Sequence, residues 1–244
     1  MIFARFPFLT RPILAVLTAL GLLATVASAN EYLILSGGPA MQEWERYRTE
    51  DTQHDKWWGN FVRAARVRIQ DLKPNLPAGT TITWLVYRDA YLRRSSEDHR
   101  PLTGFIESVR DTYGVKLVWI RSGDDVIEYI NNAPGRRSNK VAGFEYFGHS
   151  NKHCFMFDYS NQVYGASAAW LHERDLRRIR SSAFAPDAYC KSWGCHTGES
   201  MSNLWQDATG IWMIGAYGKT DYAFGHLNGW RPRLASGAHW RSRG

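Results

Sequence analysis

Short apolar runs of strand length alternate with helix-patterned segments along most of this chain of 244 residues. The strand-like runs lie at 31–38, 81–88, 115–123, 144–147, 154–159, just before Cys195, and at 211–218. Apolar residues recur at helical spacing at 58–72, 102–113, 124–132, 171–182 and 201–208. Strands that alternate with helices favour a parallel sheet with helices on both faces. We therefore predict an α/β protein with one largely parallel sheet.

Glycine and proline mark the ends of several of these helices. Pro74 follows the first helical pattern, and proline cannot continue a helix. Gly114 and Gly210 follow two later patterns, at the position where a left-handed residue caps a helix. The segment 89–101 is charged and shows no apolar stripe, so we predict it to be a loop.

The N-terminal segment has the composition of a secretory signal. Two arginines precede an apolar run at 13–26, and the small residues of a signal-peptidase site follow at 27–29. The run is shorter than the roughly 20 apolar residues that span a bilayer. We expect residues 1–29 to be a signal peptide that is removed. The mature protein is then exported, periplasmic or secreted, without stable insertion in the membrane.

The 215 residues that remain are enough for one core, so we predict one domain over residues 30–244. Loss of the two signal arginines lowers the net charge from +7 to +5. The basic residues form short scattered clusters and a basic C-terminus. Nucleic-acid binding needs a denser patch or a known motif, so no nucleic-acid partner is predicted. No cofactor is predicted either, whereas an anionic partner in the cell envelope stays open.

Two reactive residues follow predicted strands. His149 comes after the run at 144–147, and Cys195 comes after a later strand. Ligands of open α/β sheets bind beyond the carboxyl ends of the strands. A thiolate is the attacking species of a cysteine enzyme, and a nearby imidazole or helix N-terminus lowers its pKa. We predict a helix that begins near Glu199, directly after Cys195.

Ser150 offers a second interpretation, a serine hydrolase. A nucleophile elbow needs G-x-S-x-G between a strand and a helix. Lys152 occupies the last of these positions, and the next segment looks extended. A zinc site is a third interpretation, because histidines and cysteines are good zinc ligands. His149 and His153 have the spacing that works on a helix but lie across a turn, and no C-x-x-C occurs. No metal is predicted.

Two short blocks resemble the caspase-fold cysteine peptidases, the group of caspases, legumains, gingipains and clostripain. In that group an apolar strand ends in His-Gly, and a later apolar strand ends in a small residue followed by Cys. Here FEYFGHS at 144–150 and SWGCHTGESM at 192–201 are similar to both blocks, in the same order. The cysteine block looks most like that of legumain. In element order the resemblance covers most of residues 31–225.

The resemblance implies a fold and an activity. The fold would be a three-layer caspase-like, or flavodoxin-like, arrangement with a mostly parallel sheet. The activity would be that of a cysteine peptidase that cleaves peptides or proteins, with Cys195 as nucleophile and His149 as general base or acid. The backbone N–H groups of Ser150 and Cys195 would face the developing oxyanion. Ser150 stands where the family has glycine. Only its N–H has a role in this interpretation, so Ser150→Ala is expected to be tolerated.

The same resemblance makes the segment 218–226 a candidate for substrate binding. Asp221 would pair with a basic substrate side chain, because a carboxylate suits arginine or lysine. The alternative is a turn residue that caps its own backbone.

An exported chain with three cysteines has one thiol left over after a pair oxidises. If Cys195 stays a thiolate, the pair compatible with activity is Cys154 with Cys190, and three reduced thiols are the alternative.

For the whole chain, a second function stays open. It is a catalytically silent caspase-fold module that binds a partner in the cell envelope.

Overall fold

The computed structural model describes residues 30–47, 56–159, 169–223 and 225–241. The predicted signal peptide lies outside the described residues. The α-helices are α1 (Gln42–Arg46), α2 (Asn60–Leu72), α3 (Arg88–Asp98), α4 (Leu102–Tyr113), α5 (Gly123–Asn132) and α6 (Met201–Thr209). The longer strands are β1 (Asn30–Ser36), β2 (Thr81–Tyr87), β3 (Lys116–Ile120), β4 (Lys140–Phe147), β6 (Cys154–Asp158), β7 (Ala169–His172) and β8 (Phe184–Ser192).

Several shorter elements complete the described chain. The two-residue strands are β5 (His149–Ser150), β9 (Met213–Ile214), β10 (Ala216–Tyr217), β11 (Thr220–Asp221), β12 (Arg233–Leu234) and β13 (His239–Trp240). The 3₁₀ helices are η2 (Glu173–Arg178), η3 (Ser181–Ala183) and η4 (Gly225–Leu227).

A six-stranded sheet forms the middle layer of the fold. Its order is β3-β2-β1-β4-β8-β9, and every neighbouring pair is parallel. Without the edge strand β3, the sheet order is β2-β1-β4-β8-β9. If these five strands are numbered afresh in chain order, this is 2-1-3-4-5, which is the flavodoxin-type order. The structure thus confirms the predicted α/β class and its parallel sheet, in which the predicted strand at 115–123 forms the edge strand β3 next to β2.

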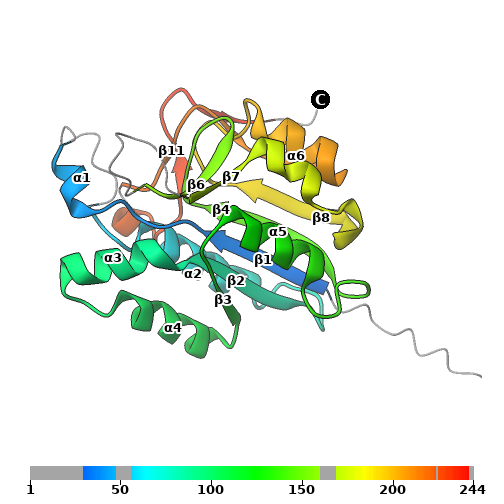
Figure 1. The fold of residues 1–244 in the computed structure, drawn as a ribbon, viewed down its shortest axis with the longest axis horizontal. Coiled ribbons are helices and arrows are strands. Elements are labelled where there is room, and N and C mark those ends of the chain that lie inside the picture. Colours follow the sequence, from blue (N-terminus) through cyan, green and yellow to red (C-terminus); the bar gives the residue numbers. More distant parts are fainter. Residues whose placement is uncertain (1–29, 48–55, 160–168, 224, 242–244) are drawn as a thin grey trace, which may run out of the picture.

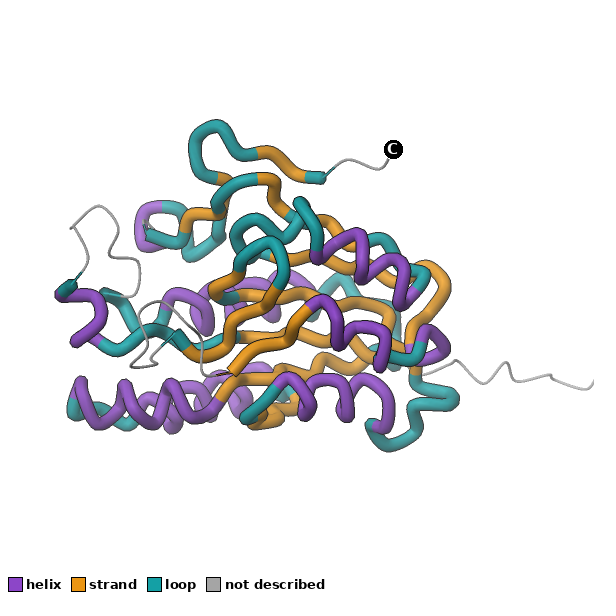
Figure 2. The backbone as a smooth tube through the Cα atoms, turned by 45° about the horizontal axis from the view of Figure 1, so that its top comes forward, coloured by secondary structure: helices purple, strands orange, loops and turns teal. Residues whose placement is uncertain are grey.

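Helices cover both faces of the sheet (Figure 1). Buried residues of α5 and α6 share one core with the sheet, and buried residues of α2 and α4 share the other. In β1, Leu33 and Leu35 enter the first core, whereas Tyr32 and Ile34 enter the second. This follows from the two-residue period of a strand. The three layers are visible in Figure 2, where helices flank the strands on both sides.

Two helix ends predicted from glycine are confirmed. Gly114 follows α4 with φ +60°, and Gly210 follows α6 with φ +75°. Both glycines adopt the left-handed conformation, which costs a residue with a side chain about 1–2 kcal/mol. The chain therefore leaves each helix where the sequence pattern places the break.

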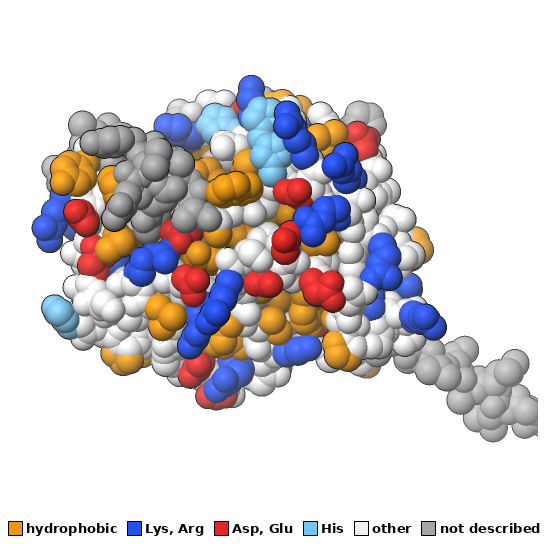
Figure 3. Space-filling view, in the orientation of Figure 1, with side chains coloured by type: hydrophobic (Ala, Val, Ile, Leu, Met, Phe, Trp, Pro, Cys, Tyr) orange, Lys and Arg blue, Asp and Glu red, His pale blue; other side chains and the backbone are white. Residues whose placement is uncertain are grey.

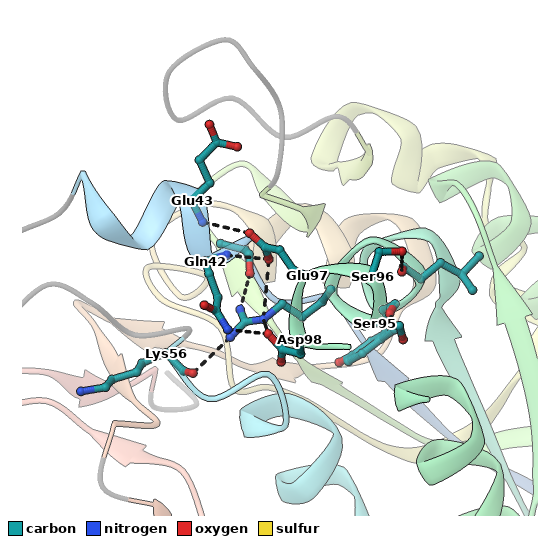
Figure 4. A network of polar contacts seen from close by, with 11 residues as sticks. Gln42, Glu43, Lys56, Ser95, Ser96, Glu97 and Asp98 are labelled. Carbon is teal, nitrogen blue, oxygen red and sulfur yellow. Dashed lines mark hydrogen bonds and ion pairs between the residues drawn. The ribbon is translucent and has the colours of Figure 1, made fainter. Parts of the chain in front are cut away.

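The segment 89–101, predicted to be a loop, is mostly the helix α3. Arg94 is buried on this helix and only 1% exposed. Its guanidinium donates to the Ala40 carbonyl over 2.7 Å and to Asp98 over 2.9 Å. Polar contacts thus replace the apolar stripe, and for this reason periodicity missed the helix. Figure 4 shows the network around this segment.

Two other elements differ from the prediction. The segment 171–182 forms the 3₁₀ helices η2 and η3 after β7, instead of one α-helix. The run 211–218 is divided into β9 and β10. Gly215 lies at the division, where an added Cβ would come within 2.4 Å of the Ser202 hydroxyl oxygen.

Smaller sheets surround the main one. β5, β6 and β7 form an antiparallel sheet, and β10 pairs with β13 as β11 pairs with β12. The C-terminal segment runs as loops and short strands at one end of the molecule (Figure 2). Among the described helices, none combines the length and the apolar character needed to cross a membrane. On the face seen in Figure 3, basic side chains are interspersed with acidic ones.

Candidate active site

The segments that carry His149 and Cys195 leave neighbouring strands at the same edge of the sheet. β4 and β8 are parallel partners, with Tyr146 opposite Ser192. His149 and Cys195 each lie three residues beyond this pair. Both predicted residues therefore reach the carboxyl edge, where ligands of such sheets bind.

Two hydrogen bonds join the segments directly. The Trp193 N–H donates to the carbonyl of Tyr146 over 2.8 Å. The Ser150 hydroxyl donates to the carbonyl of Cys195 over 2.7 Å. The backbone that carries the imidazole is thereby tied to the backbone that carries the thiol.

A tyrosine from the C-terminal segment links the same two turns. The Tyr222 hydroxyl donates to the Trp193 carbonyl over 3.0 Å and accepts from the Gly148 N–H. Burial, with smaller contributions from neighbouring groups, raises the pKa of Tyr222 well above its usual range. The hydroxyl therefore stays protonated and keeps its role as donor. Its ring lies edge-on to Phe61 of α2, with centroids 5.0 Å apart.

Aromatic side chains orient the His149 imidazole. Phe61 lies edge-on to it at 4.9 Å, and Tyr159 stacks against it at 4.8 Å with an interplanar angle of 27°. The Tyr146 hydroxyl donates to the backbone carbonyl of His149 over 2.5 Å. These contacts restrict both the ring plane and the backbone, as a positioned acid or base requires.

The Cys195 sulfur faces Thr220 at the start of β11. The Thr220 N–H lies 3.4 Å from the sulfur, and the Thr220 hydroxyl oxygen lies 3.5 Å from it. That hydroxyl donates to the Trp193 carbonyl over 2.8 Å. Thr220 therefore contacts the sulfur through both its backbone N–H and its hydroxyl.

The helix after Cys195 starts later than predicted. α6 begins at Met201, not near Glu199, and a turn separates it from the thiol. The Met201 N–H donates to the Lys152 carbonyl over 2.8 Å. The helix N-terminus therefore binds the loop after β5. The N–H that points to the sulfur comes from Thr220 instead.

The turn after Cys195 has an unusual backbone. His196 has φ +62°, a left-handed conformation that few residues with side chains adopt. Its N–H donates to the Gly218 carbonyl over 2.7 Å, and its Nδ1 lies 2.6 Å from Glu199. The His196 contact lowers the pKa of the Glu199 carboxyl, although burial opposes it. Such outliers are concentrated at functional sites.

The predicted oxyanion donors have different surroundings. The Cys195 N–H has no hydrogen-bond acceptor among the described residues, which leaves it available to a ligand. Ser150 lies in β5, opposite Phe155 of β6. The β5 and β6 strands form a hairpin, not the strand-turn-helix of a serine elbow, and the Ser150 hydroxyl is engaged with the Cys195 carbonyl.

A buried carboxylate, that of Glu145, contacts the segment that leads to Cys195. Glu145 is fully buried and accepts from Tyr32, from Arg68 Nε over 2.5 Å and from Trp193 Nε1 over 2.8 Å. Trp193 comes two residues before Cys195. Burial, followed by the Glu145 charge, raises the pKa of Tyr32 well above its usual range. The tyrosine therefore remains a donor to the carboxylate.

Both oxygens of Asp221 are engaged within the chain. Oδ1 accepts from the Ala223 N–H over 2.8 Å, and Oδ2 lies 3.0 Å from Arg233 Nε. The contact with the Ala223 N–H matches the alternative interpretation of Asp221 as a turn residue that caps its own backbone. A basic substrate side chain would have to displace Arg233, so the role of Asp221 in substrate binding stays a prediction.

All three cysteines are unpaired in the structure, which is the second of the two predicted alternatives and not the Cys154–Cys190 disulfide. Cys154 begins β6 in the antiparallel sheet, whereas Cys190 lies in β8 of the main sheet, within the core next to α6. Burial, with a smaller contribution from Glu173, raises the pKa of Cys154 to about 11. Burial raises the pKa of Cys190 to about 12. Both therefore remain neutral thiols at neutral pH.

The residues weighed as zinc ligands have other partners. His153 Nδ1 lies 2.7 Å from Glu173, and its ring stacks on His172 with an interplanar angle of 7°. Within the part of the chain that the structure describes, no three His, Cys, Asp or Glu side chains group as metal ligands.

The sequence reasoning missed Thr220 and Tyr222. The segment 218–226 is predicted to contribute through Asp221, yet it approaches the thiol through Thr220 and the two turns through Tyr222. No local motif marks either residue, since their contacts join positions more than 20 residues apart in the sequence.

The chain matches no protein-family model, no curated protein and no solved structure.

Proposed function

We propose that the protein is an exported cysteine peptidase that hydrolyses amide bonds of peptides or proteins with a Cys195–His149 dyad. The observation that carries the proposal is the Ser150–Cys195 hydrogen bond of 2.7 Å. It joins the two blocks that resemble caspase-fold peptidases, at the edge of the sheet where ligands bind.

In the proposed reaction His149 accepts the thiol proton, and the Cys195 sulfur forms a bond to the substrate carbonyl carbon. The tetrahedral intermediate places its oxygen near the N–H groups of Cys195 and Ser150. His149 then donates the proton to the leaving amine as the C–N bond breaks. Water activated by His149 hydrolyses the thioester and restores the thiol.

The surroundings of each group suit its part. The Thr220 N–H lies 3.4 Å from the Cys195 sulfur, and the aromatic contacts of His149 restrict the ring. Cys154 and Cys190 are unsuited to attack, since burial raises both pKa values and the thiolate is the nucleophile.

The test is hydrolysis of a fluorogenic peptide library by the purified protein and by variants. Cys195→Ala is expected to abolish turnover, and His149→Ala to reduce kcat/KM by about 10²–10⁴-fold. Cys154→Ala is the matched control. It removes a thiol from the neighbouring sheet and should leave turnover intact.

The outcomes separate this function from the alternatives. Retained turnover in Cys195→Ala together with loss in Ser150→Ala would establish the serine mechanism instead. Absence of turnover across the library, with a thiol probe that labels Cys195 no faster in the folded than in the denatured protein, would favour the silent binding module.

A further inference from the structure

Three arginines surround one small cavity on the α2 side of the sheet. Arg63 and Arg66 lie one turn apart on α2, and Arg100 lies between α3 and α4. The cavity has a volume of about 270 Å³, and Trp58 and Phe105 form part of its wall. These two rings stack with an interplanar angle of 27°. The cavity therefore combines cationic and aromatic groups.

No carboxylate among the described residues pairs with these three guanidinium groups. Arg63 lies over the Trp230 ring at 4.3 Å, and Arg100 lies over Phe105 at 5.3 Å. Arg66 donates to the Tyr113 hydroxyl over 3.2 Å. Their partners are thus aromatic rings and a neutral hydroxyl.

The two acidic side chains that precede Arg100 in the sequence have other partners (Figure 4). Glu97 accepts from the backbone N–H groups of Gln42 and Glu43, over 2.8 and 3.0 Å. Asp98 accepts from Arg94 over 2.9 Å and from the Gln42 side chain over 2.5 Å. Both carboxylates line the neighbouring hollow, which also contacts Arg63 and Arg100. Their oxygens are nevertheless committed to Arg94 and to the start of α1.

The three cations repel one another. Burial, and after it the charges of Arg100 and Arg66, lower the pKa of the Arg63 guanidinium. An anion in the cavity would remove this repulsion. Guanidinium groups bind tetrahedral oxyanions through two parallel hydrogen bonds, and several of them together suit a doubly charged group.

We propose that this cavity binds a tetrahedral oxyanion, a phosphate or sulfate ester, carried on an aromatic or apolar group. The arginines hold the anion, and Trp58 and Phe105 contact the apolar part. None of the residues that line the cavity contacts Cys195 or His149 in the arrangement described above, and the proposal requires no role of Cys195.

The experiment is isothermal titration of the purified protein with inorganic phosphate and with phenyl phosphate. Ionic strength is held constant with sodium chloride, since surface charge alone is screened by salt. The protein is expected to bind one equivalent of each, and phenyl phosphate more tightly. Arg63→Gln, Arg66→Gln and Arg100→Gln should each weaken binding about tenfold or more, the effect of one charge-assisted hydrogen bond.

Arg137→Gln is the control, because it removes the same charge from an exposed position outside the cavity. Phe105→Ala should reduce the preference for phenyl phosphate without loss of phosphate binding. Thermal unfolding of each variant establishes that it is folded, and the exposed Arg100 provides a variant that tests the site if Arg63→Gln does not fold. No binding of either probe, or equal weakening by Arg137→Gln, would overturn the proposal.

Discussion

The Ser150 hydroxyl and the Cys195 carbonyl are 2.7 Å apart and form a hydrogen bond. It connects the residue after the candidate base to the candidate nucleophile itself. Ser150 stands where the caspase-fold peptidases, which the two sequence blocks resemble, have glycine, so a glycine at this position could not form this hydrogen bond. The same hydroxyl leaves no room for a side chain at Gly194, since an added Cβ would lie 2.2 Å from the Ser150 Oγ.

Gly194→Ala is expected to destabilise the protein and to disturb the Cys195 turn. The new methyl group and the Ser150 hydroxyl cannot both occupy their places, and overpacking costs about 1–3 kcal/mol. Adding Ser150→Gly should recover most of the loss, leaving the Tyr146 ring at 3.3 Å as the remaining close neighbour. Urea unfolding of the single and double variants measures the coupling. Strictly additive effects would contradict the proposed contact.

Ser150→Ala has a larger expected effect than its backbone role alone predicts. Loss of the hydroxyl leaves the Cys195 carbonyl without this donor and costs about 1 kcal/mol of stability. The rate of Cys195 alkylation should change as well, because the Cys195 backbone is no longer tied to the His149 segment. If the variant and the parent have equal stability and equal alkylation rates, only the backbone of Ser150 has a role.

Alkylation at pH 7.5 is expected to label Cys195 before the other cysteines. Burial raises the pKa of Cys154 to about 11 and that of Cys190 to about 12. At pH 7.5 a group with a pKa of about 11 is less than about 0.1% thiolate, and alkylation requires the thiolate. Peptide mapping after brief exposure to iodoacetamide identifies the labelled residue. Predominant labelling of Cys154 would contradict the assignment.

Arg68→Met is expected to destabilise the protein more than Glu145→Gln. The Glu145 side chain is 0% exposed and the Arg68 side chain is 31% exposed. Removing the arginine leaves an uncompensated buried charge, at a cost of about 3–5 kcal/mol. Removing the carboxylate charge leaves an arginine that water can reach, at a cost of about 1–2 kcal/mol. Chemical unfolding with an unchanged m-value provides the comparison, and the reverse order would refute the burial argument.

Lys191 is expected to make stability rise with pH. Burial, opposed by the Glu145 charge, lowers the pKa of Lys191 to about 8 from its ordinary value of 10.5. The unfolded chain therefore binds more protons than the folded protein between these values, and the free energy of unfolding rises with pH. The burial cost of the charged amine is fully present below pH 8 and disappears above about pH 10.5.

The parent and Lys191→Met isolate this effect from other titrating groups. The parent should gain about 1 kcal/mol relative to the variant across this window, a value reduced for the partial exposure of the amine. The ammonium lies 3.5 Å from the Trp193 ring centroid and 4.0 Å from that of Trp240. These contacts favour the charged amine and limit the gain. A pH-independent difference would contradict the lowered pKa.

The sequence by itself determined the α/β class, most strands, and the placement of His149 and Cys195 at strand ends. These features depend on local periodicity and on glycine conformation, as at Gly114 and Gly210, and a short window of residues contains both. The alternation of strands and helices predicts a parallel sheet, and in such a sheet the two blocks lie at the same edge.

Only the tertiary structure decided which groups surround the thiol. Thr220 and Tyr222 act through contacts with segments distant in the sequence, and α3 forms around the buried Arg94 rather than an apolar stripe. The three cysteines are unpaired, and Cys154 and Cys190 belong to different sheets. Such contacts depend on how strands are ordered and how loops pack, and the energy that selects them appears only when the whole chain is assembled.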